Sequence, residues 1–267
     1  MTLRCGLIGF GTIGRELATA VRTGAAGDAE LVGVLVRNPQ RAAELSAEAG
    51  CLVTADLRAL LGAGVSVVVE AAGHAAVRDH AEAILRGGSD LLMCSVGVFA
   101  DDELLERVHQ AARESGRRVL VPSGGLGGLD MISSGAVGGL EEVTLTARKP
   151  PRAWVGTVGE ELALGSSEKV LLFEGSAREA ARLYPQNVNI AAALALSSIG
   201  LDRTRVRIYS DPSLTHNTHE VHARGAFGEI TVQLRNVPSS NPKTGAVVSM
   251  SMVKALRSLT SPFVVGF

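Results

Sequence analysis

The rhythm of apolar and polar positions changes partway along the chain. As far as about residue 121, short apolar runs alternate with longer segments in which apolar residues recur every three or four positions. The short runs predict buried strands at residues 3–9, 30–36, 65–71, 90–96 and 117–123. The longer segments predict amphipathic helices at 13–24, 41–50, 74–88 and 101–116. This alternation indicates an α/β domain with a doubly wound parallel sheet of the Rossmann type.

Beyond the glycine- and proline-rich segment 121–130 the strands become longer and the helices fewer. Predicted strands cover 141–149, 169–173, 205–211, 218–224 and 229–237, and predicted helices cover 176–184, 189–198 and 247–259. Such a pattern favours a second, α+β domain with mostly antiparallel strands. We expect a dinucleotide-binding domain at 1–122, a substrate domain at 123–244, a C-terminal helix within 245–267 that packs back on the first domain, and a ligand cleft between the domains.

Composition excludes several classes of function. With 46% hydrophobic and 20% charged residues, the chain can bury a substantial core, and its net charge of -1 leaves no basic surplus for nucleic acid. No apolar run has the length of a membrane span, and we expect a cytoplasmic protein that binds neither nucleic acid nor membrane. The three cysteines match neither a disulfide framework nor a zinc pattern, and Cys94, in an apolar run, is expected to be a buried thiol rather than a nucleophile.

The glycines Gly9, Gly11 and Gly14 directly follow the first predicted strand and precede a predicted helix. Glycine allows the backbone to turn sharply and to approach a pyrophosphate, which binds at the positive N-terminus of the helix. This spacing predicts an NAD or NADP site. The expected cofactor contacts in this loop are Gly9, Gly11, Thr12, Ile13 and Gly14.

The end of the second predicted strand leaves the choice between the two cofactors open. An acidic residue there usually holds the ribose hydroxyls of NAD, but Val36 and Arg37 occupy these positions. Arg37, with Arg41, could bind the 2′-phosphate of NADP through charge-assisted hydrogen bonds, or both arginines could be solvated surface residues.

Three of the six histidines fall together, at His216, His219 and His222. Because the segment is predicted to be a strand, alternate side chains point to opposite faces, and His219 shares the apolar face with Val221 and Ala223. The divergence of neighbouring histidines disfavours a metal site, and we predict none. The spacing alone leaves His219 either a hydrogen-bonded core residue or a functional one.

Other polar residues suit an acidic substrate. Asn187 and Asn189 precede an alanine-rich helix, where asparagine either caps the helix or offers an amide to a nicotinamide or a carboxylate. Lys149 and Lys243 follow or adjoin proline turns. These lysines are either solvated or bind the carboxylates of a substrate.

Motifs along essentially the whole chain resemble those of the L-aspartate dehydrogenases, which supply iminoaspartate for pyridine nucleotide synthesis. They are GFGTIG at 9–14, EAAGH at 70–74, SVG at 95–97, SGGLGGLD at 123–130, RKPPRAW at 148–154, GSAREAARLYPQNVNIAA at 175–192, NTHEV at 217–221, GAFG at 225–228 and NPKTGA at 241–246. The resemblance implies that His219 is the acid/base, and that Asn189 and Gly125 contact the cofactor. The family usually has alanine at the position of Gly125, and it often has an acid at the position of Val36.

The resemblance also implies a reaction: NAD(P)-dependent oxidation of L-aspartate to iminoaspartate, or in reverse the reductive amination of oxaloacetate with ammonia. The α-carbon would lose a hydride to the cofactor while His219 accepts a proton. We expect a homodimer. Two alternatives are another two-domain dehydrogenase, acting on homoserine, a semialdehyde or a cyclic imine, and a non-catalytic dinucleotide sensor.

Overall fold

The computed structural model describes residues 2–185, 189–237 and 245–266. It divides the chain into two compact units. The first unit combines Met1–Gly124 with Ser249–Phe267, and the second comprises Gly125–Val248. Within the described residues, no helix is long and apolar enough to cross a membrane.

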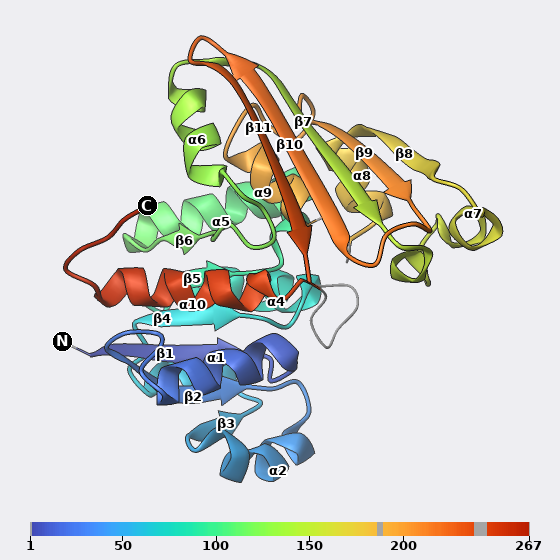
Figure 1. The fold of residues 1–267 in the computed structure, drawn as a ribbon. Helices are drawn as coiled ribbons and strands as arrows, with labels where there is room; N and C mark the ends of the chain where they lie inside the picture. Colours follow the sequence, from blue (N-terminus) through green and yellow to red (C-terminus); the bar gives the residue numbers. More distant parts are fainter. Residues whose placement is uncertain (1, 186–188, 238–244, 267) are drawn as a thin grey trace. The chain divides into compact units, whose positions relative to one another are not determined.

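The first unit is built on a six-stranded sheet in the order β3-β2-β1-β4-β5-β6, in which every neighbouring pair is parallel (Figure 1). Its strands are β1 (Leu3–Ile8), β2 (Ala29–Leu35), β3 (Leu52–Thr54), β4 (Val67–Glu70), β5 (Asp90–Met93) and β6 (Val119–Leu120). The strand order reverses direction beside β1, which is the doubly wound arrangement. The predicted Rossmann-type fold is therefore confirmed, with β3 as a strand that the sequence pattern did not predict.

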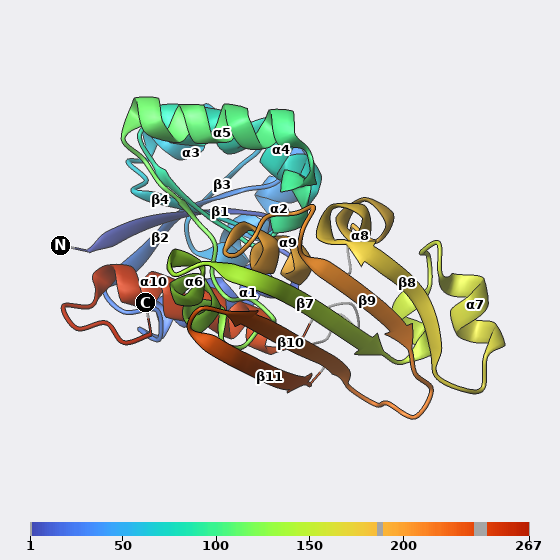
Figure 2. The same ribbon diagram turned by 90° about the horizontal axis from the view of Figure 1, so that it is seen from above.

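Helices cover both faces of this sheet. They are α1 (Thr12–Arg22), α2 (Pro39–Ala49), α3 (Leu57–Gly62), α4 (His74–Arg86), α5 (Asp102–Ser115) and α10 (Val247–Thr260), with the 3-10 helix η1 (Val96–Ala100). Leu17 of α1, Leu45 of α2 and Met252 of α10 belong to one buried cluster with the sheet. Helices α3, α4 and α5 lie on the opposite face (Figure 2). The C-terminal helix thus completes the core of the first unit.

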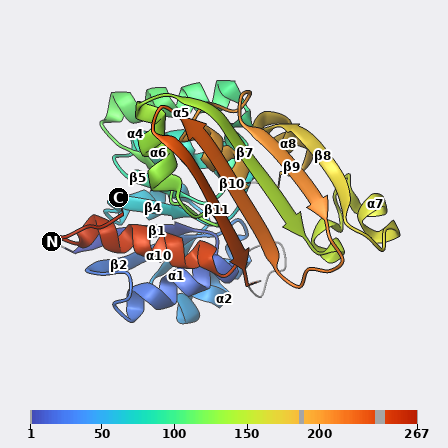
Figure 3. The same cartoon turned by 45° about the horizontal axis from the view of Figure 1, so that its top comes forward.

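The second unit contains a five-stranded sheet in the order β11-β10-β7-β9-β8 (Figure 3). Its strands are β7 (Leu140–Lys149), β8 (Val170–Ser176), β9 (Arg205–Ser210), β10 (Asn217–Gly225) and β11 (Gly228–Asn236). Three neighbouring pairs are antiparallel and the pair β7–β9 is parallel. The expectation of mostly antiparallel strands is confirmed.

The helical segments of the second unit include two that periodicity did not predict. They are α6 (Leu129–Val137), η2 (Pro151–Trp154), α7 (Glu160–Gly165), α8 (Ala177–Leu183) and α9 (Asn189–Leu196), of which α6 and α7 are the unpredicted α-helices. A capping box at Ser176 and Glu179 begins α8. Helices α8 and α9 lie on one face of the sheet (Figure 2).

Side chains along the strands of the second sheet alternate between a buried and an exposed face, and some polar side chains lie on the buried face. Buried residues recur at every second position of β7, β9 and β10. The same alternation places Lys149, Ser210 and His219 on the buried side, near the ends of their strands. The other face is charged, with Arg148 bonded to Glu220 at 3.0 Å. The buried face therefore combines an apolar interior with several polar groups, Lys149, Ser210 and His219 among them.

Candidate active site

The glycine loop after β1 has the geometry of a phosphate-binding turn. Gly9 has φ +90°, and a Cβ there would lie 2.8 Å from the Cβ of Ala72 and 2.9 Å from the carbonyl oxygen of Ala71. A Cβ on Gly14 would collide with the carbonyl oxygen of Gly9, so α1 packs directly against the loop. Glycine is thus required both for the turn and for the close approach of the helix.

The N-terminus of α1 is suited to an anion. Gly11 is its N-cap and offers no capping side chain, and the first turn contains no acidic residue. A Cβ on Gly11 would meet nothing within 4 Å, so the space beside this residue is open. Backbone amides in the first turn, including those of Thr12 and Ile13, together with the helix dipole, fit the pyrophosphate of a dinucleotide.

The end of β2 lies beside this loop, because the amide of Gly9 donates to the carbonyl of Leu35 at 2.9 Å. Val36, where an acid is usual, is half-buried and packs against the core of the first unit. Arg37 is exposed directly beyond it, and Arg41 is exposed in the first turn of α2. The residues at the end of β2 and the start of α2 are therefore cationic, where many Rossmann folds have a carboxylate that holds the adenosine ribose.

Glu70 is a buried carboxylate that sequence reasoning did not single out. It ends β4 with 1% of its surface exposed. Its Oε1 accepts hydrogen bonds from the amides of Ala72 and Gly73 at 2.8 and 2.7 Å and from the Ser95 hydroxyl at 2.9 Å. Its Oε2 accepts from the amides of Cys94 and Ser95 at 3.2 and 3.0 Å. Glu70 therefore joins the loops that follow β4 and β5, which carry the EAAGH and SVG motifs.

His219, on β10, is the central polar residue of the second unit, with 7% of its surface exposed. Its Nδ1 lies 3.2 Å from the carbonyl oxygen of Gly125, and Asn236 Nδ2 donates to the same oxygen at 3.3 Å. A carbonyl only accepts, so Nδ1 carries the hydrogen and Nε2 is left with its lone pair. No hydrogen bond to Nε2 is present among the described residues. The neutral imidazole thus presents a buried proton acceptor, and its predicted position on the apolar face is confirmed.

The buried lysine Lys149 lowers the pKa of His219. It ends β7, is 2% exposed, and its Nζ lies 5.3 Å from the centroid of the Trp154 ring. Burial lowers the pKa of Lys149 to about 8. Burial, and then the positive charge of Lys149, lower the pKa of His219 to about 3, although its hydrogen bond with Gly125 acts in the opposite direction. Without ligand, the histidine is therefore neutral beside a cation.

Several residues implied by the motifs gather around His219. A Cβ on Gly125 would lie 3.4 Å from Cγ2 of Ile190, which follows Asn189 at the start of α9, and 3.6 Å from Asn236 Nδ2. A Cβ on Gly245 would lie 2.9 Å from Cγ of Asn236, so the end of the NPKTGA motif meets the end of β11. Sequence reasoning missed Asn236. Two other candidates, Asn187 and Lys243, lie outside the described residues.

The other two histidines of the cluster, His216 and His222, and the thiol of Cys94 lie in surroundings different from those of His219. His216 contacts the hydroxyl of Thr215 at 2.7 Å, and His222 contacts Glu229 at 2.9 Å on the exposed face. Over the ranges that the structure describes, no group of three metal-ligating side chains occurs. Burial raises the pKa of the Cys94 thiol to about 12, so it has no thiolate available for nucleophilic attack at neutral pH.

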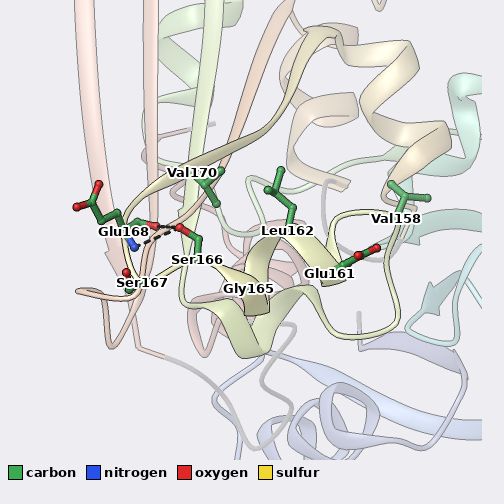
Figure 4. Close-up of a pocket in the computed structure, with 8 residues that line it drawn as sticks. All are labelled: Val158, Glu161, Leu162, Gly165, Ser166, Ser167, Glu168 and Val170. Atoms are coloured by element: carbon green, nitrogen blue, oxygen red, sulfur yellow. Dashed lines mark hydrogen bonds between the residues drawn. The ribbon is translucent and has the colours of Figure 1, made fainter.

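Two surface pockets of the second unit contain neither His219 nor Lys149. One lies along α7 and the start of β8 (Figure 4), and its lining residues are Val158, Glu161, Leu162, Gly165, Ser166, Ser167, Glu168 and Val170. The other is lined by Arg148, Ser213, Leu214, Thr215, His216, Thr218, Gln233 and Arg235. Because Arg148 and Thr218 alternate with Lys149 and His219, this second pocket opens on the charged face of the sheet.

Two family models match the two parts of the chain. The NAD-binding domain of homoserine dehydrogenase matches residues 9–122, and the C-terminal region of aspartate dehydrogenase matches 130–259. The chain is 38% identical to the L-aspartate dehydrogenase of Cupriavidus necator, covering 95% of this chain and 96% of that protein. It is 40% identical to L-aspartate dehydrogenase 2 of Bordetella bronchiseptica over 100% of both chains.

Solved structures give the same result. The crystal structure of aspartate dehydrogenase from Thermotoga maritima matches with a TM-score of 0.77 and 28% identity, over 99% of this chain and 100% of that one. A homoserine dehydrogenase from Thiobacillus denitrificans, at 15% identity and a TM-score of 0.60, shares the fold. The fold of the first unit and its glycine loop are those of a dehydrogenase that uses NAD or NADP. Within this class, the chain belongs to the L-aspartate dehydrogenase family.

Proposed function

We propose that the chain oxidises L-aspartate to iminoaspartate with NAD or NADP, and in reverse aminates oxaloacetate with ammonia, supplying pyridine nucleotide biosynthesis. The family assignment supports this activity. The observation that carries the chemistry is His219, whose Nε2 is buried without a hydrogen-bond partner among the described residues while Nδ1 is held by Gly125. A dehydrogenase acting on an amine needs such a proton acceptor.

The first unit holds the cofactor in this proposal. When bound, the oxidised nicotinamide accepts the hydride from the α-carbon. The turn at Gly9 and the open N-terminus of α1 hold the pyrophosphate, and the exposed Arg37 meets a 2′-phosphate where one is present. We assign cofactor contacts in the second unit to Gly125 and Asn189.

The second unit moves the proton. Oxidation of the substrate ammonium to a protonated imine releases one proton besides the hydride, and the lone pair on His219 Nε2 accepts it. In the reverse reaction the imidazolium returns this proton. A pKa of about 3 makes the unliganded histidine a weak base. The two negative charges of a bound dicarboxylate stabilise the imidazolium and offset the charge of Lys149, so substrate binding raises the pKa of His219.

Lys149 supplies a buried positive charge on the same sheet face as His219. We assign it to a substrate carboxylate. Asn236 acts through the carbonyl of Gly125, which it holds in place for Nδ1 of His219. Lys243 stays a predicted substrate contact.

We also propose a cytoplasmic homodimer. The three cysteines are free thiols, which is the state that a reducing compartment maintains. Two-fold dimers are the commonest oligomers of soluble proteins. Sedimentation velocity tests the dimer.

The test is the reduction of NAD and of NADP, followed by absorbance, with L-aspartate, L-glutamate, L-alanine and L-homoserine as substrates. L-aspartate should give the highest kcat/KM. Preferred turnover of homoserine would support the other class of two-domain dehydrogenase. Cofactor binding without turnover of any of the four substrates would support a dinucleotide sensor.

A further inference from the structure

Like His219 Nε2, two more buried polar atoms of the second unit have no hydrogen-bond partner among the described residues. Trp154 Nε1 and Ser210 Oγ are both buried, and neither forms a hydrogen bond within the described part of the chain. Both residues are fully buried, with 0% of their surface exposed. An indole N–H and a hydroxyl normally find partners when buried, because an unmade hydrogen bond costs free energy. Two such donors in one unit indicate a site that is completed by a ligand.

Strand register brings these groups together around Lys149. Lys149 is paired with Ser210 across the parallel strands β7 and β9, and Ala147 is paired with His219 across β7 and β10. Paired residues direct their side chains to the same face, so Lys149, Ser210 and His219 share the buried side of the sheet. Trp154 joins them from η2, with its ring centroid 5.3 Å from Lys149 Nζ.

The walls of this region are apolar. Ala147 and Ile208, which pair with each other one step before Lys149 and Ser210, are each 0% exposed. The Tyr184 ring packs edge-on against Trp154, with 5.7 Å between centroids. In such surroundings a hydrogen bond to a charged group is strengthened because water does not compete. An ammonium, an indole N–H and a hydroxyl that are buried in apolar surroundings are donors suited to a carboxylate.

We propose that Trp154 Nε1 and Ser210 Oγ, together with Lys149, bind the side-chain carboxylate of the substrate and so select a four-carbon dicarboxylate. The assignment rests on the proposed function. Ser210 lies on β9, two strands from His219 on β10, and neighbouring strands are about 4.8 Å apart. His219 must reach the amino group on the α-carbon. The carboxylate that meets Ser210 is therefore the one farther from that carbon.

Trp154 is the only tryptophan in the sequence, so its fluorescence reports on this subsite directly. The probe is succinate, a four-carbon dicarboxylate that has no amino group, titrated into the full chain saturated with NAD. Calorimetry gives the affinity independently of the optical signal. We expect succinate to change the Trp154 emission with the same Kd that calorimetry measures. Binding by calorimetry with no change in emission would overturn the assignment of Trp154.

Ser210→Ala separates binding from structure. The Ser210 hydroxyl has no partner within the described residues, so its removal should leave Tm unchanged or slightly higher. We expect the same variant to weaken succinate binding by about tenfold or more, since it loses a hydrogen bond to a charged group. The matched control is Ser213→Ala, an exposed serine bonded to Asp211, which should change the Kd by less than about twofold. A Ser210→Ala protein that binds succinate like the wild type would overturn the subsite.

Two amino acids identify which carboxylate is bound. Ser210→Ala should weaken binding of L-aspartate but not of L-2-aminobutyrate, which lacks the side-chain carboxylate. Equal weakening of both would show that Ser210 meets the α-carboxylate, contradicting the proposal. These results can be told apart from a failure of the proposed function. If the wild-type chain oxidises L-aspartate and Ser210→Ala leaves the Kd unchanged, only the subsite is disproved. A chain that binds succinate through Ser210 but does not oxidise L-aspartate disproves only the reaction.

Discussion

Replacing Glu70 by glutamine tests whether this carboxylate organises the loops after β4 and β5. The carboxylate accepts five hydrogen bonds, four of them from backbone amides. Glutamine has nearly the same shape, but one of its two terminal groups donates instead of accepting. Glu70→Gln therefore removes acceptors without removing volume.

The structure sets the size of the effect. If the glutamine oxygen takes the position of Oε1, the bonds from Ala72 and Gly73 remain, and the two bonds from the amides of Cys94 and Ser95 to Oε2 are lost. Hydrogen bonds to a charged group contribute about 1.5–3 kcal/mol each, so two lost bonds amount to about 3–6 kcal/mol. A neutral amide is easier to bury than a carboxylate, which favours the lower figure. We expect the free energy of unfolding to fall by about 3 kcal/mol.

Denaturant unfolding followed by circular dichroism at neutral pH measures this loss. Hydrogen-exchange mass spectrometry of the segments around 70–74 and 94–97 should show faster exchange of the amides that Glu70 binds. The control is Glu30→Gln, an exposed partner of Arg4 at 3.0 Å, which should cost less than about 1 kcal/mol. A loss for Glu70→Gln as small as for the control, with unchanged exchange, would refute the role given to Glu70.

Three further predictions concern binding and proton transfer. Arg37→Ala should weaken NADP binding by about tenfold or more and leave NAD binding within about twofold, as measured by calorimetry; equal effects would exclude a 2′-phosphate contact. Because burial lowers the pKa of Lys149 to about 8, the lysine loses its charge above that pH, and succinate binding should weaken as pH rises through about 8 but stay constant below it. Lys149→Met should abolish that pH dependence, and its persistence would assign it to another group. Asn236→Ala removes one of the two donors to the Gly125 carbonyl. The variant should lower kcat for L-aspartate about fivefold and leave the KM for NAD unchanged. An unchanged kcat would mean that Asn236 does not position His219.

The sequence pattern predicted elements whose periodicity extends over several turns or strand positions. The long helices α4 and α5 and the strands β7 and β10 fall close to their predicted ranges. β3, with three residues, and α3, with six, are too short to display a period. The helix α6 contains serine and glycine, which favour turns in isolation, and packing of its Ile132 outweighs that preference.

The candidate site was predictable where it depended on local pattern. Strand alternation placed His219 on the buried face, and the glycine spacing located the turn at Gly9. Asn236 and Ser210 were not predictable, because their positions depend on which strands pair and in which register. Ser210 meets Lys149 only through the parallel pair β7–β9, whose members lie more than fifty residues apart in the sequence. Glu70 was missed because its partners are amides of two separate loops.

The most direct test of the account is the kinetics of His219→Ala with L-aspartate. The proposal assigns proton transfer to Nε2 of His219, which forms no hydrogen bond within the described residues. Loss of a general base predicts a fall in kcat of about 100-fold or more. The Kd for NADH, measured in parallel, should change by less than about twofold, since the glycine loop is untouched. A variant that oxidises L-aspartate at a rate close to that of the wild type would contradict the central claim.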